Sequence, residues 1–307
     1  MEQQIKGLMN VGLNVQVLFV NRAQGGIFEY LLLKKGVIKA CQRFDPDIVH
    51  CMYGGVMADI VTRTIIDRPT VVSFCGSDLL GELLSGLSRK VVSYGGILAS
   101  FRAAKRANGV VVKSLNLKRA LPKSVVPSKI RIIPNGVDLA RFRPLNRNLC
   151  RKHLGWRNDW FHILFPTNGG DPRKRIDLAF SAIEVLNRGG VKAELHELKG
   201  VTHQHVPIWL NACDVVLLTS LHEGSPNIIK EALACNIAIV SVDVGDVCDR
   251  IALVEGCHIA MPCQADLAMK LQLVCSGSRR VVGRKVLQGL SLEEVARRLA
   301  TFYSELF

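Results

Sequence analysis

Two glutamates eight positions apart, Glu223 and Glu231, flank a short polar loop that could bind a phosphate or a sugar. The loop follows an apolar run, residues 214–218, that predicts a buried strand, and Ser225 and Pro226 suit the cap and first position of a helix. Backbone N–H groups at such a helix start can bind a phosphate or the polar face of a sugar. Glu223 would lie before the helix and Glu231 more than one turn inside it. One carboxylate could then bind sugar hydroxyls and the other ribose hydroxyls.

A second polar segment, residues 166–175, follows the apolar run 161–165 and ends in three cations, Arg173, Lys174 and Arg175. A basic segment after a buried strand suits an anion bound at the carboxyl edge of a sheet. It is also typical of a helix start that simply faces solvent. Both interpretations of the three cations stay open on the residues alone.

The elements that must position these loops follow one pattern along most of the chain, in which apolar β-branched runs alternate with amphipathic segments. Runs of four to seven apolar residues without strict alternation predict strands buried on both faces. The expected strands are residues 15–20, 47–51, 70–74, 109–112, 130–133, 161–165, 214–218, 237–241 and 258–261. Among the expected helices are residues 27–44, 56–66, 175–187 and 226–235. This order predicts an α/β protein with parallel sheets covered by helices.

The length of 307 residues suits two domains, and a turn-rich segment at residues 133–144 predicts where they divide. Two prolines and an Asn-Gly pair lie in that segment, and the apolar pattern restarts at Phe161. We expect domains at 1–145 and 146–290. A final helix, 291–307, is expected to pack back toward the first domain.

The first domain begins with an expected helix at residues 2–10, before the expected strand 15–20. A doubly wound domain normally opens with a strand and a glycine-rich loop. We therefore expect this chain to lack the first structural unit of its domain, through a misassigned start or a natural truncation. The alternative is a variant whose sheet has one strand fewer.

Four segments in the same order resemble retaining glycosyltransferases of family 4. Residues 223–235 are similar to the E-x7-E motif in the form EGxPNxxxEAxAC, and residues 133–138 with 142–144 are similar to the linker of that family. Gly76-Ser77-Asp78 resembles its "HGSD" segment, and residues 47–50 resemble its "DvvH" strand. The resemblance implies the GT-B fold, in which two Rossmann-like doubly wound α/β domains face each other across a cleft.

The resemblance also implies a role for each donor-side residue. Glu223 would contact the donor sugar and Glu231 the donor ribose, whereas the alternative is charge complementarity at a helix start. Lys174 matches the family's diphosphate-binding lysine, where positive charge stabilises the departing nucleoside diphosphate. The usual arginine position falls on Gly170 or Asp171, so Arg173 or Arg175 would substitute. The remaining donor-binding candidates are Gly224, Ser225, Pro226, Asn227 and Asn168.

On the acceptor side the candidates are His50, Cys75, Gly76 and Asp78. The family often has a histidine where Cys75 stands, and a thiol cannot replace the two nitrogens of an imidazole. His50 at a strand end has an equally simple structural interpretation. No Asp-x-Asp pair of the metal-binding kind is found, so we expect no metal and no cofactor.

The function implied is transfer of a hexose, with retention of configuration, from a UDP-, GDP- or ADP-sugar to a glycan or lipid-linked acceptor. Such a reaction belongs to polysaccharide or glycoconjugate biosynthesis. The alternatives are a catalytically impaired paralogue that only binds nucleotide sugar and a GT-B nucleotide-sugar epimerase.

Charge and cysteine content bear on the surroundings of the protein. The net charge is +14, and residues 1–146 hold 21 Lys and Arg against 9 Asp and Glu. A basic first domain could dock on an anionic membrane surface. A nucleic-acid partner is not expected, because aromatic residues make up only 6% and no binding module is recognised. The ten cysteines form no C-x-x-C pair, and the chain does not open with a secretory signal, so we expect a cytoplasmic protein, peripheral on the cytoplasmic membrane face.

Overall fold

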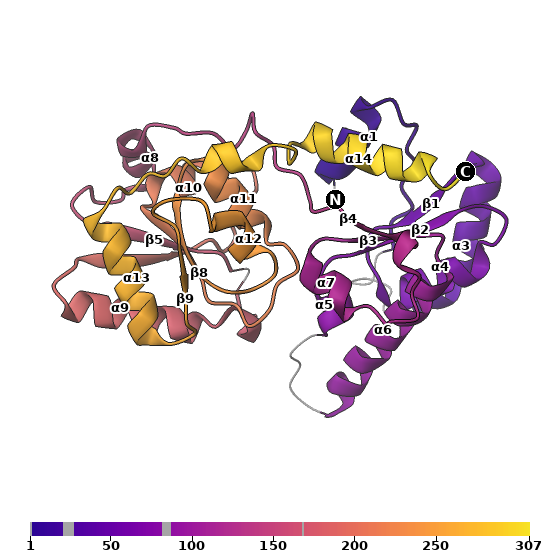
Figure 1. Ribbon diagram of the computed structural model, residues 1–307, viewed down its shortest axis with the longest axis horizontal. Coiled ribbons are helices and arrows are strands. Elements are labelled where there is room, and N and C mark those ends of the chain that lie inside the picture. Colours follow the sequence, from indigo (N-terminus) through magenta and orange to yellow (C-terminus); the bar gives the residue numbers. More distant parts are fainter. Residues whose placement is uncertain (1, 21–27, 82–86, 168) are drawn as a thin grey trace. The chain divides into compact units, whose positions relative to one another are not determined.

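The computed structural model describes residues 2–20, 28–81, 87–167 and 169–307 (Figure 1). The chain divides into two compact units. Unit 1 contains Met1–Gly136 and Leu292–Phe307, and unit 2 contains Val137–Ser291. Each unit has its own parallel sheet, which confirms the predicted α/β class.

The sheet of unit 1 has the strand order β1-β2-β3-β4. Its strands are β1 (Val49–Cys51), β2 (Thr70–Phe74), β3 (Gly109–Val112) and β4 (Ile130–Ile132), and all pair in parallel. Every residue of β2 and β3 is buried. These central strands therefore consist of apolar and small residues without alternation, as strands covered on both faces do.

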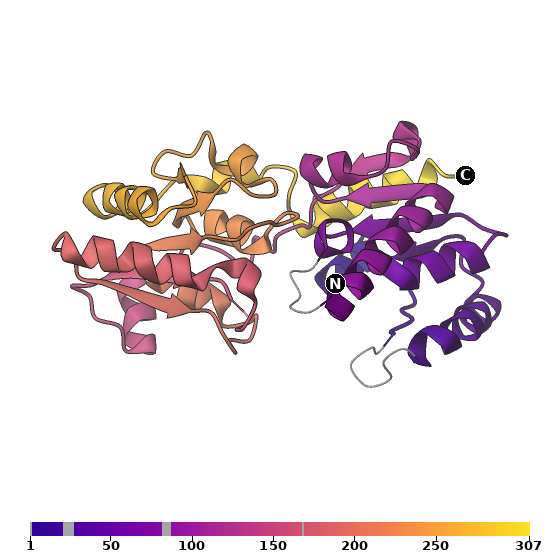
Figure 2. The same cartoon turned by 90° about the horizontal axis from the view of Figure 1, so that it is seen from below.

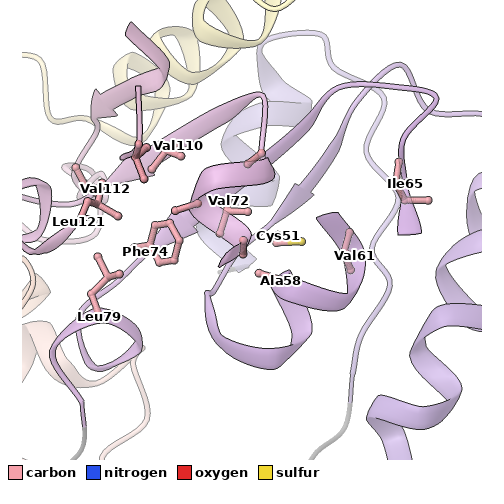
Figure 3. Close-up of a cluster of buried hydrophobic side chains, with 14 of the residues drawn as sticks. Cys51, Ala58, Val61, Ile65, Val72, Phe74, Leu79, Val110, Val112 and Leu121 are labelled. Atoms are coloured by element: carbon pink, nitrogen blue, oxygen red, sulfur yellow. The ribbon is translucent and has the colours of Figure 1, made fainter. Parts of the chain in front are cut away.

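Helices cover this sheet, and the core lies between them and the strands. The side chains of Val72, Phe74, Val110 and Val112 point from β2 and β3 into a cluster that includes Ala58 (Figure 3). Burying each of the larger side chains contributes about 1.5 to 3 kcal/mol. The helices are α1 (Glu2–Asn10), α3 (Phe28–Phe44), α4 (Gly55–Thr64), α5 (Ser77–Leu80), α6 (Leu87–Arg106), α7 (Leu115–Ala120), the 3-10 turn η1 (Pro127–Lys129) and α14 (Leu292–Ser304).

The last helix, α14, packs against α1 from the opposite end of the sequence (Figure 1). Glycine permits the close approach, because a Cβ on Gly7 would lie 3.3 Å from the Cβ of Ala296. Phe302 packs over Gly109 at the start of β3, where a Cβ would lie only 2.7 Å from its ring. Helix α14 is thus an integral part of unit 1.

The prediction of a strand at residues 15–20 is wrong. These residues form no strand, and Val17 and Phe19 are 50% and 72% exposed. A strand needs a neighbour to receive its backbone hydrogen bonds, and within the described residues this segment pairs with none. Whether a first structural unit is missing stays a prediction.

The sheet of unit 2 has the strand order β6-β5-β7-β8-β9, again with all pairs parallel. Its strands are β5 (Phe161–Phe165), β6 (Ala193–Glu197), β7 (Val215–Leu218), β8 (Ala238–Val242) and β9 (His258–Ala260). After β5 the chain forms the edge strand β6 on one side of β5, and it then forms β7 on the other side of β5. The carboxyl ends of β5 and β7 are therefore a topological switch point, where open α/β sheets bind ligands.

Helices cover both faces of this second sheet. Helices α9 and α13 pack together on one face, and α8 and α10 pack together on the other (Figures 1 and 2). The helices are α8 (Arg147–Leu154), η2 (Pro172–Lys174), α9 (Ile176–Arg188), α10 (Val206–Ala212), α11 (Asn227–Ala234), α12 (Val247–Ile251), α13 (Gln264–Ser276) and η3 (Gly283–Leu287). Among the described residues, no helix combines the length and the apolar character that a membrane span needs.

Candidate active site

The two donor-side segments meet at the switch point of unit 2. The loop after β7 is tied to the loop after β5, because the Leu221 N–H donates to the Arg173 carbonyl at 2.8 Å. The Thr219 hydroxyl donates to the carbonyls of Lys174 and Arg175 at 2.7 and 2.9 Å. These bonds hold the basic segment beside the loop that carries Glu223.

Lys174 and Glu223 form an ion pair across the two loops. The Lys174 Nζ donates to the Glu223 Oε1 at 2.5 Å, and both side chains are about four-fifths buried. A cation and a carboxylate at the carboxyl edge of parallel strands can bind the phosphate and the hydroxyls of one ligand.

The neighbouring arginines bind acids close to them in sequence. Arg173 makes a two-pronged contact with Asp171, with Nη2 at 2.7 Å from Oδ2, and these hydrogen bonds lower the pKa of Asp171. Arg175 lies 3.4 Å from Asp177. Lys174, between these two arginines, contacts Glu223 instead.

The backbone of the 166–175 loop turns through unusual conformations. Gly169 and Gly170 have φ of +82° and +71°, and Arg175 has φ of +52°, which is uncommon for a residue other than glycine. The turn at Arg175 exposes its carbonyl to the Thr219 hydroxyl. Asn168, a predicted donor-binding residue, lies outside the described residues.

The start of α11 differs from the prediction by one residue. Pro226 is the N-cap residue and the helix begins at Asn227, so Ser225 is not the cap. Instead the Ser225 hydroxyl donates to Asp246 at 2.9 Å and accepts from the buried Lys230 at 3.1 Å. These two charged groups hold the hydroxyl, and the N-cap residue Pro226 makes no side-chain capping hydrogen bond.

A third loop, after β8, packs against the loop that carries Glu223. A Cβ on Gly245 would lie 2.8 Å from the Gly224 carbonyl oxygen, and Gly245 has φ of +61°. Both the close approach and the left-handed backbone require glycine here. Gly245 thus packs directly against the backbone of Gly224, the residue that follows Glu223.

Glu231 lies in the second turn of α11 with its side chain 12% exposed. The His203 Nε2 lies 3.0 Å from its Oε1, and this hydrogen bond raises the pKa of His203. The ring of His203 packs on Phe142, which is fully buried. Sequence reasoning missed His203, because it stands in a loop with no motif around it.

In unit 1 the Asp78 carboxylate is used by the backbone around it. It accepts the N–H groups of Gly54, Cys75 and Gly76 at 2.8 to 3.1 Å. Asp78 is 5% exposed, and burial raises its pKa. This arrangement folds the loop after β2 and leaves the carboxylate little capacity for a ligand.

His50 is held on both ring nitrogens. Its Nδ1 lies 2.5 Å from the Tyr303 hydroxyl on α14, and its Nε2 lies 2.8 Å from the Ser73 hydroxyl. Burial lowers its pKa to about 3, so the ring is neutral, and the charge of Lys113 contributes. The geometry favours the structural interpretation of His50.

Cys75 is a partly buried thiol whose pKa is raised to about 11 by burial. Its Sγ lies 3.6 Å from the Met52 carbonyl oxygen. Sequence reasoning also missed Lys113, which follows β3 directly, is 2% exposed and interacts electrostatically with Cys75 and Asp78. A lysine at the end of a fully apolar strand was the available signal for this residue.

Among the described residues, one group of His, Cys, Asp or Glu side chains has the spacing of metal ligands. It consists of His162, Glu194 and His196, and it includes none of the candidate residues above.

The fold of the whole chain is that of GT-B glycosyltransferases. Sucrose-phosphate synthase from Thermosynechococcus elongatus matches with a TM-score of 0.79 and 15% identity, covering 99% of this chain and 92% of that one. Anabaena HepE, solved in complex with UDP-glucose, matches with a TM-score of 0.71 and 16% identity, over 89% of this chain and 82% of that one.

Family models match both units. Residues 11–141 match Glycosyltransferase Family 4, and residues 169–276 match Glycosyl transferases group 1. The chain belongs to the family 4 type of glycosyltransferases with the GT-B fold.

Curated relatives agree with this family. A D-inositol 3-phosphate glycosyltransferase from Paenarthrobacter aurescens is 29% identical over 164 residues, which are 42% of this chain and 40% of the relative. A putative teichuronic acid biosynthesis glycosyltransferase, TuaC, from Bacillus subtilis is 26% identical over 239 residues, 70% of this chain and 58% of the relative. The matched stretches thus span about half the length of these relatives.

Proposed function

We propose that the chain transfers a hexose from a nucleotide-diphospho-sugar to a glycan or lipid-linked acceptor, with retention of configuration. The observation that carries this proposal is the Lys174–Glu223 ion pair at the switch point of unit 2, together with the hydrogen bond between Glu231 on α11 and His203. We place the reaction in the biosynthesis of a polysaccharide or glycoconjugate.

The donor would lie on the three loops of unit 2. Its diphosphate would bind Lys174 and the backbone of Gly224–Asn227, its sugar would bind Glu223, and its ribose would bind Glu231. A uridine nucleotide is supported by HepE, which was solved with UDP and with UDP-glucose. GDP- and ADP-sugars are the alternatives that a binding panel must include.

The proposed transfer breaks one bond to the anomeric carbon and forms another. The bond between the anomeric carbon and the diphosphate oxygen breaks, and the diphosphate leaves with the electron pair. The acceptor hydroxyl oxygen would form the new bond to the anomeric carbon, and its proton would pass to the leaving diphosphate. Lys174 stabilises the charge that develops on the leaving oxygens, which is the kind of contribution that a fixed cation makes best.

Unit 1 would bind the acceptor and, through its charge, an anionic membrane surface on the cytoplasmic side. Unit 1 holds 21 Lys and Arg against 11 Asp and Glu. Each basic residue near an anionic surface contributes about 1 kcal/mol. The protein should therefore sediment with phosphatidylglycerol vesicles at low salt, and not with neutral vesicles. Absence of binding at low salt removes this part of the proposal.

A catalytically impaired paralogue that only binds nucleotide sugar is favoured by one observation. Arg173 and Arg175 both contact acids close to them in sequence, Asp171 and Asp177, whereas Lys174 contacts Glu223. Release of nucleoside diphosphate separates the two functions, since an impaired protein binds the donor without turnover.

The proposal is tested by a thermal-shift panel with UDP, GDP, ADP and their sugars. A ligand at about 100 times its Kd stabilises the folded form by about 2.7 kcal/mol, which is a shift of several degrees. We expect one nucleotide to raise the unfolding midpoint of the wild type and to lose this effect in Glu231→Gln.

The matched control is Glu184→Gln, at an exposed glutamate on α9 of the same unit. It should respond as the wild type does. Equal shifts in Glu231→Gln and the wild type, or no shift with any nucleotide, would contradict the donor site.

A further inference from the structure

Two histidines and a glutamate lie together on the neighbouring strands β5 and β6, at a place that the donor loops do not include. The parallel register sets His162 opposite Glu194, and Leu164 opposite His196. Because alternate residues of a strand share a face, His162, Glu194 and His196 project from the same face of the sheet.

Their ligand atoms form a compact triangle. The His162 Nδ1 lies 2.8 Å from the His196 Nε2, and the Glu194 Oε2 lies 3.7 and 3.6 Å from these two nitrogens. Around a tetrahedral zinc ion with bonds near 2.0 to 2.1 Å, ligand atoms are about 3.3 Å apart. The three distances between ligand atoms, 2.8, 3.6 and 3.7 Å, lie on either side of this value. A zinc ion therefore fits between the three ligand atoms if each distance changes by a few tenths of an ångström.

The tautomer of His162 is set by its second nitrogen. The His162 Nε2 lies 2.6 Å from the Arg157 carbonyl oxygen, which can only accept, so Nε2 carries the proton. The lone pair of Nδ1 therefore faces His196 and Glu194. A histidine that donates one N–H to a backbone carbonyl and presents the other nitrogen is the usual arrangement of a metal ligand.

The ligand set is rigid on one side and open on the other. His162 is fully buried, and Trp156 stacks on His196 at 3.6 Å between ring centroids. Trp209 packs edge-on against Trp156. The Glu194 side chain is 47% exposed, so solvent reaches the triangle from its side and can supply a fourth ligand.

We propose that His162, Glu194 and His196 bind a divalent zinc ion, with water in the fourth position. Two imidazole nitrogens and one carboxylate oxygen are a normal protein ligand set for this ion. On binding, the His196 proton moves from Nε2 to Nδ1, so that Nε2 can coordinate. The ion would link the edge strand β6 to β5 and stabilise unit 2, independently of the donor site.

The test is calorimetric titration of the chelator-treated full chain with Zn²⁺ alone. The protein carries Cys248→Ser and Cys263→Ser, because these two exposed thiols are competing soft ligands. We expect one site per chain with a Kd in the micromolar range or tighter, and a rise of several degrees in the unfolding midpoint at saturation.

Glu194→Gln should weaken this site at least tenfold, and its half-exposed side chain makes it a safe change for folding. His196→Gln should abolish it, and His153→Gln, at an exposed histidine on α8, should leave it unchanged. Absence of a one-to-one Zn²⁺ site, or equal Zn²⁺ affinity with and without Glu194→Gln in the Cys248→Ser, Cys263→Ser protein, overturns the proposal.

Discussion

Units 1 and 2 share an architecture and differ in what their polar residues contact. In unit 2, Lys174 and Glu223 form an ion pair, Glu231 is hydrogen-bonded to His203, and all three keep part of their surface exposed. In unit 1, Asp78 and His50 are consumed by backbone N–H groups and buried hydroxyls. Similar motif residues can thus bind a ligand in one unit and build a loop in the other. The expected effects of substitution follow from this difference.

The largest effect on turnover should come from Glu223→Gln. The change removes the charge that positions Lys174 and weakens contact with the sugar. Loss of one such preorganised group costs about 100- to 1,000-fold in kcat. Release of nucleoside diphosphate from the selected nucleotide sugar measures it, with Glu184→Gln as control. Wild-type turnover in Glu223→Gln would remove this residue from the active site.

In unit 1 the largest effect should fall on stability. Asp78→Ala leaves three N–H groups without their acceptor, two of them buried (Gly54 and Gly76), at about 1 to 3 kcal/mol for each buried unsatisfied group before the loop relaxes. Denaturant unfolding should show a large loss of stability in unit 1. Nucleotide binding by the folded protein should be retained. Loss of nucleotide affinity without loss of stability would mean that Asp78 serves a ligand.

Two glycine substitutions sharpen the assignment of the third donor loop. Gly245 and Gly155 both have left-handed φ, +61° and +71°, so alanine strains the backbone similarly at each. At Gly245 the new Cβ would also meet the Gly224 carbonyl at 2.8 Å, whereas at Gly155 it meets nothing within 4 Å. We expect Gly245→Ala to weaken nucleotide binding about tenfold and Gly155→Ala to leave it unchanged. Equal affinities for the two variants would separate this loop from the site.

The smallest effect is a pH dependence from His203. Its pKa is raised by the hydrogen bond to Glu231, so the pair stabilises the fold below the unfolded pKa of histidine. This contribution is lost as the pH rises through the folded pKa, above about 6.5. It should stay under about 1 kcal/mol, because His203 is half-exposed and solvent screens it. The stability difference between wild type and His203→Gln should shrink from pH 6 to pH 8, and a constant difference would exclude the charged pair.

The predictable part of the fold was the part that is buried on both faces. Apolar runs such as residues 70–74 and 161–165 are recognised as strands from their own composition, without knowledge of the neighbouring strands. The edge strand β6 was missed, because Ala193–Glu197 is largely polar and only half-buried. Residues 15–20 have the composition of a strand, but no strand in the described part of the chain pairs with them. The composition of a segment describes that segment alone, whereas a strand forms only when a second segment accepts and donates its backbone hydrogen bonds.

The candidate site followed the same rule. Glu223 and Glu231 lie in one continuous motif, so both could be selected as candidates from their spacing in the sequence. His203 and the His162–Glu194–His196 triangle join residues from separate segments, and the sheet register brings the triangle together. The prediction that Ser225 caps α11 was wrong, because the helix begins one residue later, at Asn227, and the Ser225 hydroxyl donates to Asp246, 21 residues away.

The central claim, that the donor diphosphate binds unit 2 at Lys174, is tested most directly by calorimetry on two matched lysines. Lys174 and Lys113 both follow a buried strand, one in each unit. We predict that Lys174→Met weakens binding of the selected nucleoside diphosphate at least tenfold, while Lys113→Met leaves its Kd unchanged. Unchanged affinity in Lys174→Met, or a loss confined to Lys113→Met, would contradict the account.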